Sequence, residues 1–359
     1  MRKSLCLLLI WLSFIIPATL VATTTTAGGS DYSASISSDG PLQVVTLEDR
    51  GRQMVVRIGV NIGNRAFEFS VKGQNVLWTP PYQKPSELKA ATFFGVPVLS
   101  PFANRLSEDA FYANGKKYLL NDALGNIRRD GDKNKLAIHG MVHSHPGWQV
   151  VSVQADENSA EVVSRLEFWK FPELMAQFPF AHTMEMHYRL ENGTLEVETA
   201  ITNLGSEDLP LAIGFHPYYR VFDAPRDDWS LTIPARTQMV LDDKNLPTGE
   251  RRPNPVAPGS TLKTLKLDDV FVDLVRDGSG WATFELKGKS QKVKVAMGPA
   301  FRAGVVFTPM DGRATVAIEP MTAVTNGFNL AQRGQYPELQ TVAPGATWWE
   351  RFRITPEGF

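Results

Sequence analysis

Apolar and polar residues alternate in many short segments of this chain from Leu42 onward. The clearest segment runs from Thr183 to Asn203, where nearly every second residue is apolar on both sides of Asn192-Gly193. A period of two residues predicts a strand with one buried face, and Asn-Gly favours a tight two-residue turn, so this segment is predicted to form an antiparallel hairpin. Shorter segments with the same features are 54–59, 66–71, 231–233, 283–286 and 348–354.

No long stretch keeps a helical period, and no segment recurs at a fixed interval, which argues against a propeller or a solenoid. Residues 171–178, with Pro172 near the start and Pro179 after the end, predict one or two helical turns. We therefore expect an all-β fold with few short helices, in which residues 41–359 form a single domain. The charged, Pro/Gly-rich stretch 242–259 is predicted to be a long connection beside a binding site.

The N-terminus has the layout of a secretory signal. Arg2 and Lys3 precede an uncharged, apolar run from Leu5 to Ala22, and the polar, low-complexity residues 23–40 follow it. This order predicts a signal peptide over 1–22, a tether over 23–40 and an exported protein, periplasmic or extracellular, with no stable membrane span after cleavage. The alternative is an uncleaved anchor, because the run approaches the length of a membrane span.

The chain has nearly balanced charge, with 37 Lys and Arg against 38 Asp and Glu. It lacks a basic block, so nucleic acid and anionic lipid are poor candidate partners, and a small neutral molecule suits it better. The only cysteine, Cys6, lies inside the predicted signal, so a mature chain depends on its packed core for stability. Phosphate loops, dinucleotide fingerprints and Gly-x-Ser-x-Gly elbows are missing from the sequence.

Two titratable residues follow predicted strands that are far apart along the chain. His216 comes after the apolar run 209–213, and Glu319 after the run 315–318. Taken alone, these positions fit a structural histidine and a solvated glutamate better than catalytic groups. If both side chains face one another across a sugar-sized gap, they can act as acid and base on one substrate.

Two further clusters place polar groups after apolar runs. Asn104-Arg105 offers several hydrogen-bond donors to sugar hydroxyls, and His139-Gly140 precedes Trp148. A zinc site is not expected around His139, since no cysteine is available and the neighbouring histidines lack a His-Glu-x-x-His frame. The basic residues of the loop before it are expected to be solvated; they are Arg128, Arg129 and Lys133.

Together these clusters resemble the aldose 1-epimerase, or galactose mutarotase, family. The similar segments, in the order of the family, are 62–78, 95–105, 139–148, 179–193, 214–218, 267–271 and 318–320. The resemblance implies a large antiparallel β-sandwich, called a supersandwich, with an open cleft and neither a metal nor an organic cofactor. It also implies an isomerase that interconverts the α and β anomers of a free aldose of the glucose or galactose type.

The resemblance assigns roles residue by residue. Glu319 matches the base that takes the proton from the anomeric hydroxyl, and His216 the acid that protonates the ring oxygen. The substrate-binding positions are matched by Asn104, Arg105, His139 and Asp268, with Asp269 as the alternative to Asp268. The segment 122–135 departs from the family by its length and charge.

Two rival functions stay open. A hexose-6-phosphate 1-epimerase shares the fold and the acid–base pair but needs a cationic pocket, which Arg128, Arg129 and Lys133 would have to supply. A non-catalytic carbohydrate-binding protein needs no acid–base pair at all. Either a monomer or a homodimer is compatible with the sequence.

Overall fold

A computed structural model describes residues 31–91, 93–131 and 135–359. The predicted signal peptide, 1–22, lies outside these ranges. Antiparallel pairing joins all neighbouring named strands within them. The all-β fold expected from the alternating pattern is confirmed.

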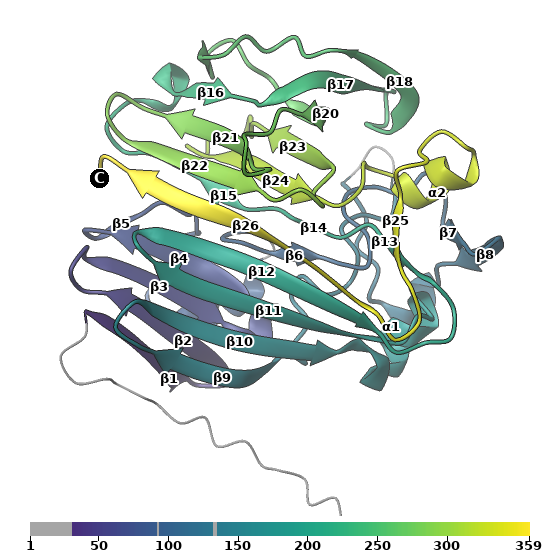
Figure 1. The fold of residues 1–359 in the computed structure, drawn as a ribbon, viewed down its shortest axis with the longest axis horizontal. Helices are drawn as coiled ribbons and strands as arrows, with labels where there is room; N and C mark the ends of the chain where they lie inside the picture. Colours follow the sequence, from purple (N-terminus) through teal and green to yellow (C-terminus); the bar gives the residue numbers. More distant parts are fainter. Residues whose placement is uncertain (1–30, 92, 132–134) are drawn as a thin grey trace, which may run out of the picture.

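A large sheet forms one layer of the sandwich (Figure 1). Within the described ranges it has nine strands, in the spatial order β19 (Ser260–Thr261), β16 (Ser230–Thr232), β21 (Ala282–Lys287), β22 (Lys292–Met297), β26 (Thr347–Glu357), β12 (Thr194–Asn203), β11 (His182–Glu191), β10 (Ser159–Glu167) and β9 (Gln149–Ala155).

Two sheets lie behind this layer, one behind each half (Figure 1). The first runs from β1 to β5 as Tyr32–Asp39, Leu42–Asp49, Met54–Gly59, Arg65–Val71 and Gln74–Asn75. The second has the order β18 (Pro247–Pro253), β17 (Ala235–Leu241), β20 (Asp268–Leu274), β23 (Ala303–Phe307), β24 (Val316–Met321), β14 (Gly214–Phe215) and β6 (Val98–Leu99), with β15 (Tyr218–Tyr219) also on β24.

Small elements complete the fold. Two further strand pairs are β7 (Ala110–Ala113) with β8 (Lys116–Leu119) and β13 (Leu209–Leu211) with β25 (Gln340–Val342). The helices are α1 (Pro172–Gln177) and α2 (Gly327–Gln332), and the 3-10 turns are Val60–Ile62, Pro85–Ala90, Asp122–Leu124, Phe168–Lys170 and Arg226–Asp228. None of the helices in the described part of the chain has the length and apolar run that crossing a bilayer requires.

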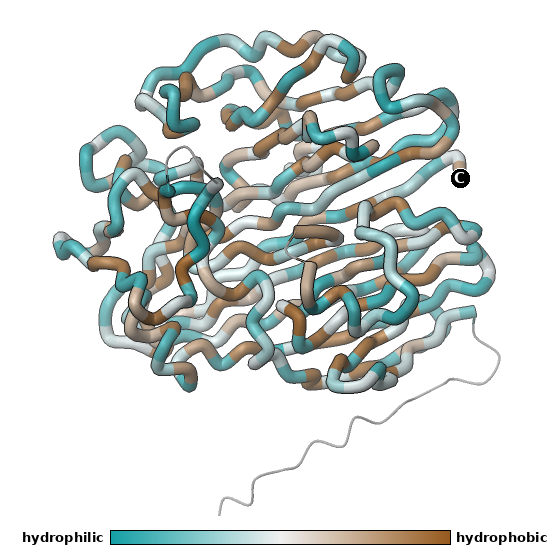
Figure 2. The backbone as a smooth tube through the Cα atoms, turned by 180° about the vertical axis from the view of Figure 1, so that it is seen from behind, coloured by the Kyte–Doolittle hydropathy of each residue, from teal (hydrophilic) through white to brown (hydrophobic). Residues whose placement is uncertain are grey.

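The predicted hairpin is confirmed as β11 and β12, whose side chains alternate between buried and half-buried. Asn192 and Gly193 both have positive φ, of 47° and 77°, as the two-residue turn requires. The same alternation is visible along the strands in Figure 2, where hydrophobic and hydrophilic positions follow one another. The helical turns predicted for 171–178 are confirmed as α1.

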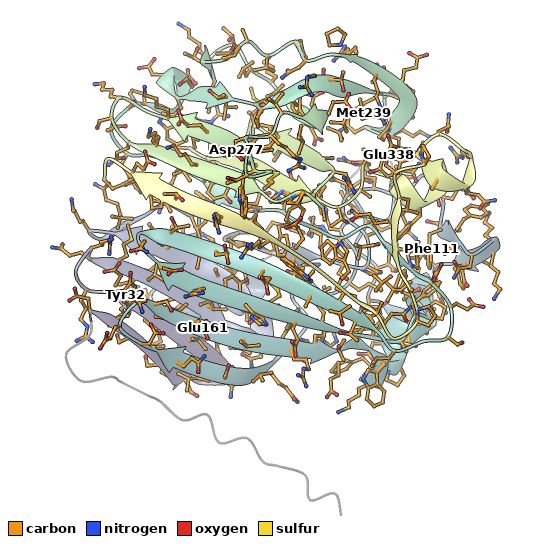
Figure 3. The ribbon with its side chains drawn as sticks, viewed as in Figure 1. Tyr32, Phe111, Glu161, Met239, Asp277 and Glu338 are labelled. Carbon is orange, nitrogen blue, oxygen red and sulfur yellow. The ribbon has the colours of Figure 1, made fainter. Side chains whose placement is uncertain are left out.

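Two boundaries predicted from the sequence are wrong. The tether predicted for 23–40 includes β1, which pairs with β2 along its whole length and buries Tyr32 and Ala34. Figure 3 labels Tyr32 on this strand. The connection predicted for 242–259 contains β18, which pairs with β17. In both cases polar composition hid a strand, because an edge strand exposes most of its side chains to water.

The layers are held together by buried apolar side chains and a few directed contacts. One continuous cluster of buried apolar residues extends through both halves of the sandwich. Across the layers, the Tyr188 hydroxyl of β11 donates a hydrogen bond of 2.7 Å to the Asn64 carbonyl, and the rings of Phe215 and Phe352 lie 4.8 Å apart. The Phe215 contact anchors β14, directly before His216, and β14 pairs with β24, which carries Glu319.

Candidate active site

Backbone pairing brings His216 and Glu319 together. Gly214 pairs with Met321 and Tyr218 pairs with Ala317, so the register between them sets His216 opposite Glu319. The imidazole Nε2 lies 3.2 Å from the carboxyl Oε1, and the two side chains are 8% and 1% exposed. The sequence prediction that both residues belong to one site is therefore consistent with the structure.

The expectation of a sugar-sized gap between the two groups is wrong. Neighbouring strands lie about 4.8 Å apart, and opposed side chains on the same face touch. His216 lines a cleft, and Glu319 lies beneath it, with its Oε2 buried and without a hydrogen-bond partner among the described residues. His216 therefore belongs to the wall of the cleft, and Glu319 supports it from behind.

Burial acts on both members of this pair. It raises the pKa of the Glu319 carboxyl well above its usual range; the Asp268 carboxylate acts in the same direction, and Arg105 opposes it. Burial also lowers the pKa of His216 to about 3, and the positive charges of Arg128 and Arg313 add to this effect. Removal from water disfavours each charged form, so burial favours a neutral pair that holds one proton.

Two hydrogen bonds hold Asn104 and His139 together. Both adopt positive φ, of 56° and 65°; the His139 amide donates to the Asn104 carbonyl at 3.0 Å, and the Asn104 amide donates to His139 Nδ1 at 3.3 Å. Burial and the neighbouring His216 lower the pKa of His139 well below its usual range. A neutral ring that accepts at Nδ1 carries its proton on Nε2, so His139 is a hydrogen-bond donor to a ligand.

Arg105 and Asp268 face each other across the cleft. An Arg105 terminal nitrogen lies 3.6 Å from Asp268 Oδ2, and Arg105 Nε donates to Asp130 at 2.8 Å. Asp268 also accepts from Asn245 at 2.9 Å. Asp269 instead accepts from Gln238 of β17, so of the two aspartates only Asp268 lines the cleft.

The cleft has a volume of about 270 Å³, near the lower end of the range for small-molecule sites. The residues that line it come from several segments of the chain. They are Phe93, Asn104, Arg105, Arg128, Ile138, His139, His216, Tyr218, Asp268, Phe307 and Arg313. Every site residue predicted from the sequence thus lies in this cleft, except Glu319, which lies directly behind His216.

Sequence reasoning missed several members of the site. Asp130 orients Arg105, and Arg313 lines the cleft, yet neither follows an apolar run that would single it out. The expectation that Arg128 is solvated is wrong, because its side chain is half-buried in the cleft and covers the Phe93 ring at 4.5 Å. Arg129 is instead paired with Asp109 and Asp122 outside the cleft.

One further histidine, His143, lies near the cleft, and burial favours its neutral form as well. His143 stacks on Phe93 with ring centroids 5.0 Å apart, and burial lowers its pKa to about 3. Among the described residues, no three His, Cys, Asp or Glu side chains come together as candidate metal ligands.

Comparison with known proteins agrees with this architecture. Residues 43–355 match the model of the aldose 1-epimerase family. Over 214 residues the chain is 23% identical to the uncharacterized protein YihR of Escherichia coli (strain K12), a match that covers 58% of this chain and only 63% of that relative.

Solved structures share the fold. A galactose mutarotase-like protein from Clostridium acetobutylicum superposes with a TM-score of 0.80 at 22% identity, covering 92% of this chain and 99% of that one. A putative aldose 1-epimerase from Escherichia coli K12 gives a TM-score of 0.62 at 18% identity, covering 91% and 100%. From the family match over residues 43–355, the chain belongs to the aldose 1-epimerase family.

Proposed function

We propose that this protein is an aldose 1-epimerase that interconverts the α and β anomers of a free aldohexose. The observation that carries the proposal is the contact of 3.2 Å between Nε2 of His216, which lines a sugar-sized cleft, and Oε1 of Glu319 directly behind it. A binding protein has no need to keep two titratable groups buried against each other, because burial of such groups costs free energy unless it serves a function.

The reaction moves one proton off the sugar and one onto it. Glu319 takes the proton of the anomeric hydroxyl O1, the C1–O5 bond breaks as C1=O1 forms, and His216 gives a proton to O5. Rotation about C1–C2 then presents the other carbonyl face, and the reverse transfers close the ring. Because O1 and O5 are both bonded to C1, an acid and a base that touch each other can serve both oxygens without a gap between them.

Substrate binding supplies the charge separation that this assignment needs. Burial favours the proton on Glu319 and a neutral His216. The positive charge of Arg105 lowers the pKa of Glu319, and a sugar hydroxyl placed against the pair would stabilise the carboxylate further. The shared proton then moves to His216, which becomes the acid.

Four side chains are proposed to hold the sugar. His139 donates from Nε2, and Asn104 and Arg105 offer further donors to hydroxyls and the ring oxygen. Asp268 accepts from hydroxyl groups, and Asn245 and Arg105 fix its position. On the pattern of the N-terminus, we further propose that the reaction takes place outside the cytoplasm.

The test is the rate at which freshly dissolved α-D-glucose and α-D-galactose reach anomeric equilibrium, followed by polarimetry with and without the protein. We expect the protein to accelerate at least one of these aldoses well above the buffer rate. Binding of these sugars without any acceleration would instead support a non-catalytic carbohydrate-binding protein.

A further inference from the structure

Two guanidinium groups line the cleft beyond those that the proposed reaction uses. Arg128 lies over the Phe93 ring at 4.5 Å. Arg313 lies 4.9 Å from the Trp78 ring centroid and 5.4 Å from that of Tyr218. Cation–π contacts of this kind fix the plane of a guanidinium group before a ligand arrives.

These two arginines carry positive charge that the protein leaves largely uncompensated. Arg105 has two carboxylate neighbours, Asp130 and Asp268. Arg128 has no carboxylate within 4.0 Å among the described residues, and its Nε is buried without a hydrogen-bond partner there. Arg313 pairs through Nε with Asp311, a half-exposed neighbour in the same turn, at 2.8 Å, and also hydrogen-bonds the Tyr218 side chain, which holds it at the cleft.

Both charges act on the same part of the cleft. Arg128 and Arg313 each lower the pKa of His216, and each also lowers that of the Tyr218 hydroxyl, against the effect of burial. His216 stacks on Tyr218 with ring centroids 4.7 Å apart, so both arginines act on the part of the cleft that these two rings line. A small sugar bound at His216 is therefore within reach of both.

A neutral sugar does not need two further positive charges beside Arg105, because uncharged donors such as His139 and Asn104 already serve its hydroxyl groups. Planar guanidinium groups match the geometry of carboxylate and phosphate oxygens and make paired hydrogen bonds with them. We propose that Arg128 and Arg313 form an anion subsite, and that the preferred substrate is an aldose that carries an oxyanion, either a carboxylate or a phosphate. This inference rests on the proposed epimerase function and narrows its substrate class.

The test compares kcat/KM for anomerisation of D-glucose, D-glucuronic acid and D-glucose 6-phosphate at low and moderate ionic strength. We expect at least one anionic sugar to exceed glucose by about tenfold or more, since a charge-assisted contact is worth about that factor or more. The preference should shrink as salt is added. The better of the two anionic sugars identifies the carboxylate or the phosphate as the source of the charge.

Single variants locate the subsite. Arg128→Gln and Arg313→Gln should each lower the ratio of anionic to neutral kcat/KM by about tenfold. Arg236→Gln is the control, because Arg236 is an exposed arginine of β17 that does not line the cleft and its loss changes net charge equally. Wild-type protein that handles all three sugars equally, at either salt concentration, would overturn the subsite even if a cleft variant failed to fold.

A binding measurement separates this inference from the proposed function. Calorimetric titration of the Glu319→Gln variant with each sugar reports the subsite without turnover. Tighter binding of an anionic sugar, lost in Arg128→Gln, supports the subsite even if no sugar is anomerised and the epimerase proposal fails. Anomerisation of glucose together with equal binding of all three sugars would retain the epimerase and reject the subsite.

Discussion

His216 and Glu319 are directly opposed on neighbouring segments of one sheet, and their Nε2 and Oε1 atoms lie 3.2 Å apart. Strand pairing on both sides of the pair fixes this contact, because Gly214 and Tyr218 are each paired with β24. The acid and the base therefore depend on backbone hydrogen bonds for their alignment. A rigid sheet holds such groups more accurately than loops do.

The pH dependence of kcat/KM should follow the protonation of His216 and Glu319. Because the pKa of His216 is lowered to about 3, the pair takes up its second proton only near that pH. We expect kcat/KM at pH 4.5 to be at least half of its value at pH 7, whereas an unshifted imidazole of pKa about 6.5 would be almost fully protonated at pH 4.5. Exchange NMR would measure kcat/KM over this pH range, with circular dichroism to confirm that the protein stays folded. A loss of kcat/KM with a midpoint near pH 6.5 would refute the lowered pKa of His216.

Asp130 should act as a positioning residue for Arg105. Asp130→Asn removes the charge from a half-buried hydrogen bond of 2.8 Å to Arg105 Nε, which should raise KM for the aldose about tenfold and change kcat less. Asp122→Asn is the matched control, since Asp122 pairs with Arg129 outside the cleft. Equal steady-state kinetics for the two variants would contradict this role.

Gly140 should resist substitution because of both its conformation and its surroundings. It has φ of 60°, and a Cβ there would lie 2.0 Å from the Ser100 carbonyl oxygen. Gly140→Ala should cost about 3 kcal/mol or more in the free energy of unfolding and displace the adjacent His139. Gly115 has a similar φ of 71°, but a Cβ there would meet open space, so Gly115→Ala should cost only about 1 to 2 kcal/mol in the same urea titration. Equal losses of stability in the two variants would mean that the close approach of Gly140 to Ser100 is not important.

His182 should make the fold less stable in acid. It is buried, stacks on Phe168 at 4.2 Å between centroids, and has its pKa lowered to about 4 by burial. The unfolded chain binds this proton as pH falls below about 6.5, while the folded chain stays neutral until about pH 4, so stability is lost in that window.

Replacing His182 with Gln removes this titration. The decrease in the free energy of unfolding between pH 7 and pH 4 should then be smaller by on the order of 2 to 3 kcal/mol than in the wild type. Urea titrations at both pH values would measure it. Parallel pH dependence of the two proteins would show that His182 titrates normally in the folded state.

Local patterns were enough to predict the strands whose two faces differ. The hairpin 183–203 has one apolar face and a turn that tolerates positive φ, and both features are encoded by adjacent residues. The strand β1 was missed although Tyr32, Ala34 and Ile36 alternate with polar residues, because its serines resemble those of the preceding low-complexity segment. The edge strand β18 was missed for a similar reason.

The sequence predicted which residues belong to the site better than it predicted how they are arranged. His216, Glu319, Asn104, Arg105, His139 and Asp268 were found through ordered motifs, and all lie in or directly behind the cleft. The direct contact of His216 with Glu319 depends on the register of two segments far apart in sequence, which local patterns do not encode. For the same reason, nothing in the charged stretch around Arg128 and Asp130 distinguished these residues from solvated neighbours such as Arg129.

The most direct test of the central proposal compares anomer exchange by the wild type with exchange by variants of Glu319 and His216. Glu319→Gln keeps size and polarity, His216→Asn keeps a polar side chain, and both remove the acid–base function. Glu285→Gln on β21 is the control because Glu285 does not line the cleft. Exchange NMR on an aldose that the wild type turns over should show a loss of about 10²- to 10⁴-fold in both cleft variants, with sugar binding retained and the control unaffected. Wild-type exchange rates in either Glu319→Gln or His216→Asn would contradict the proposed mechanism.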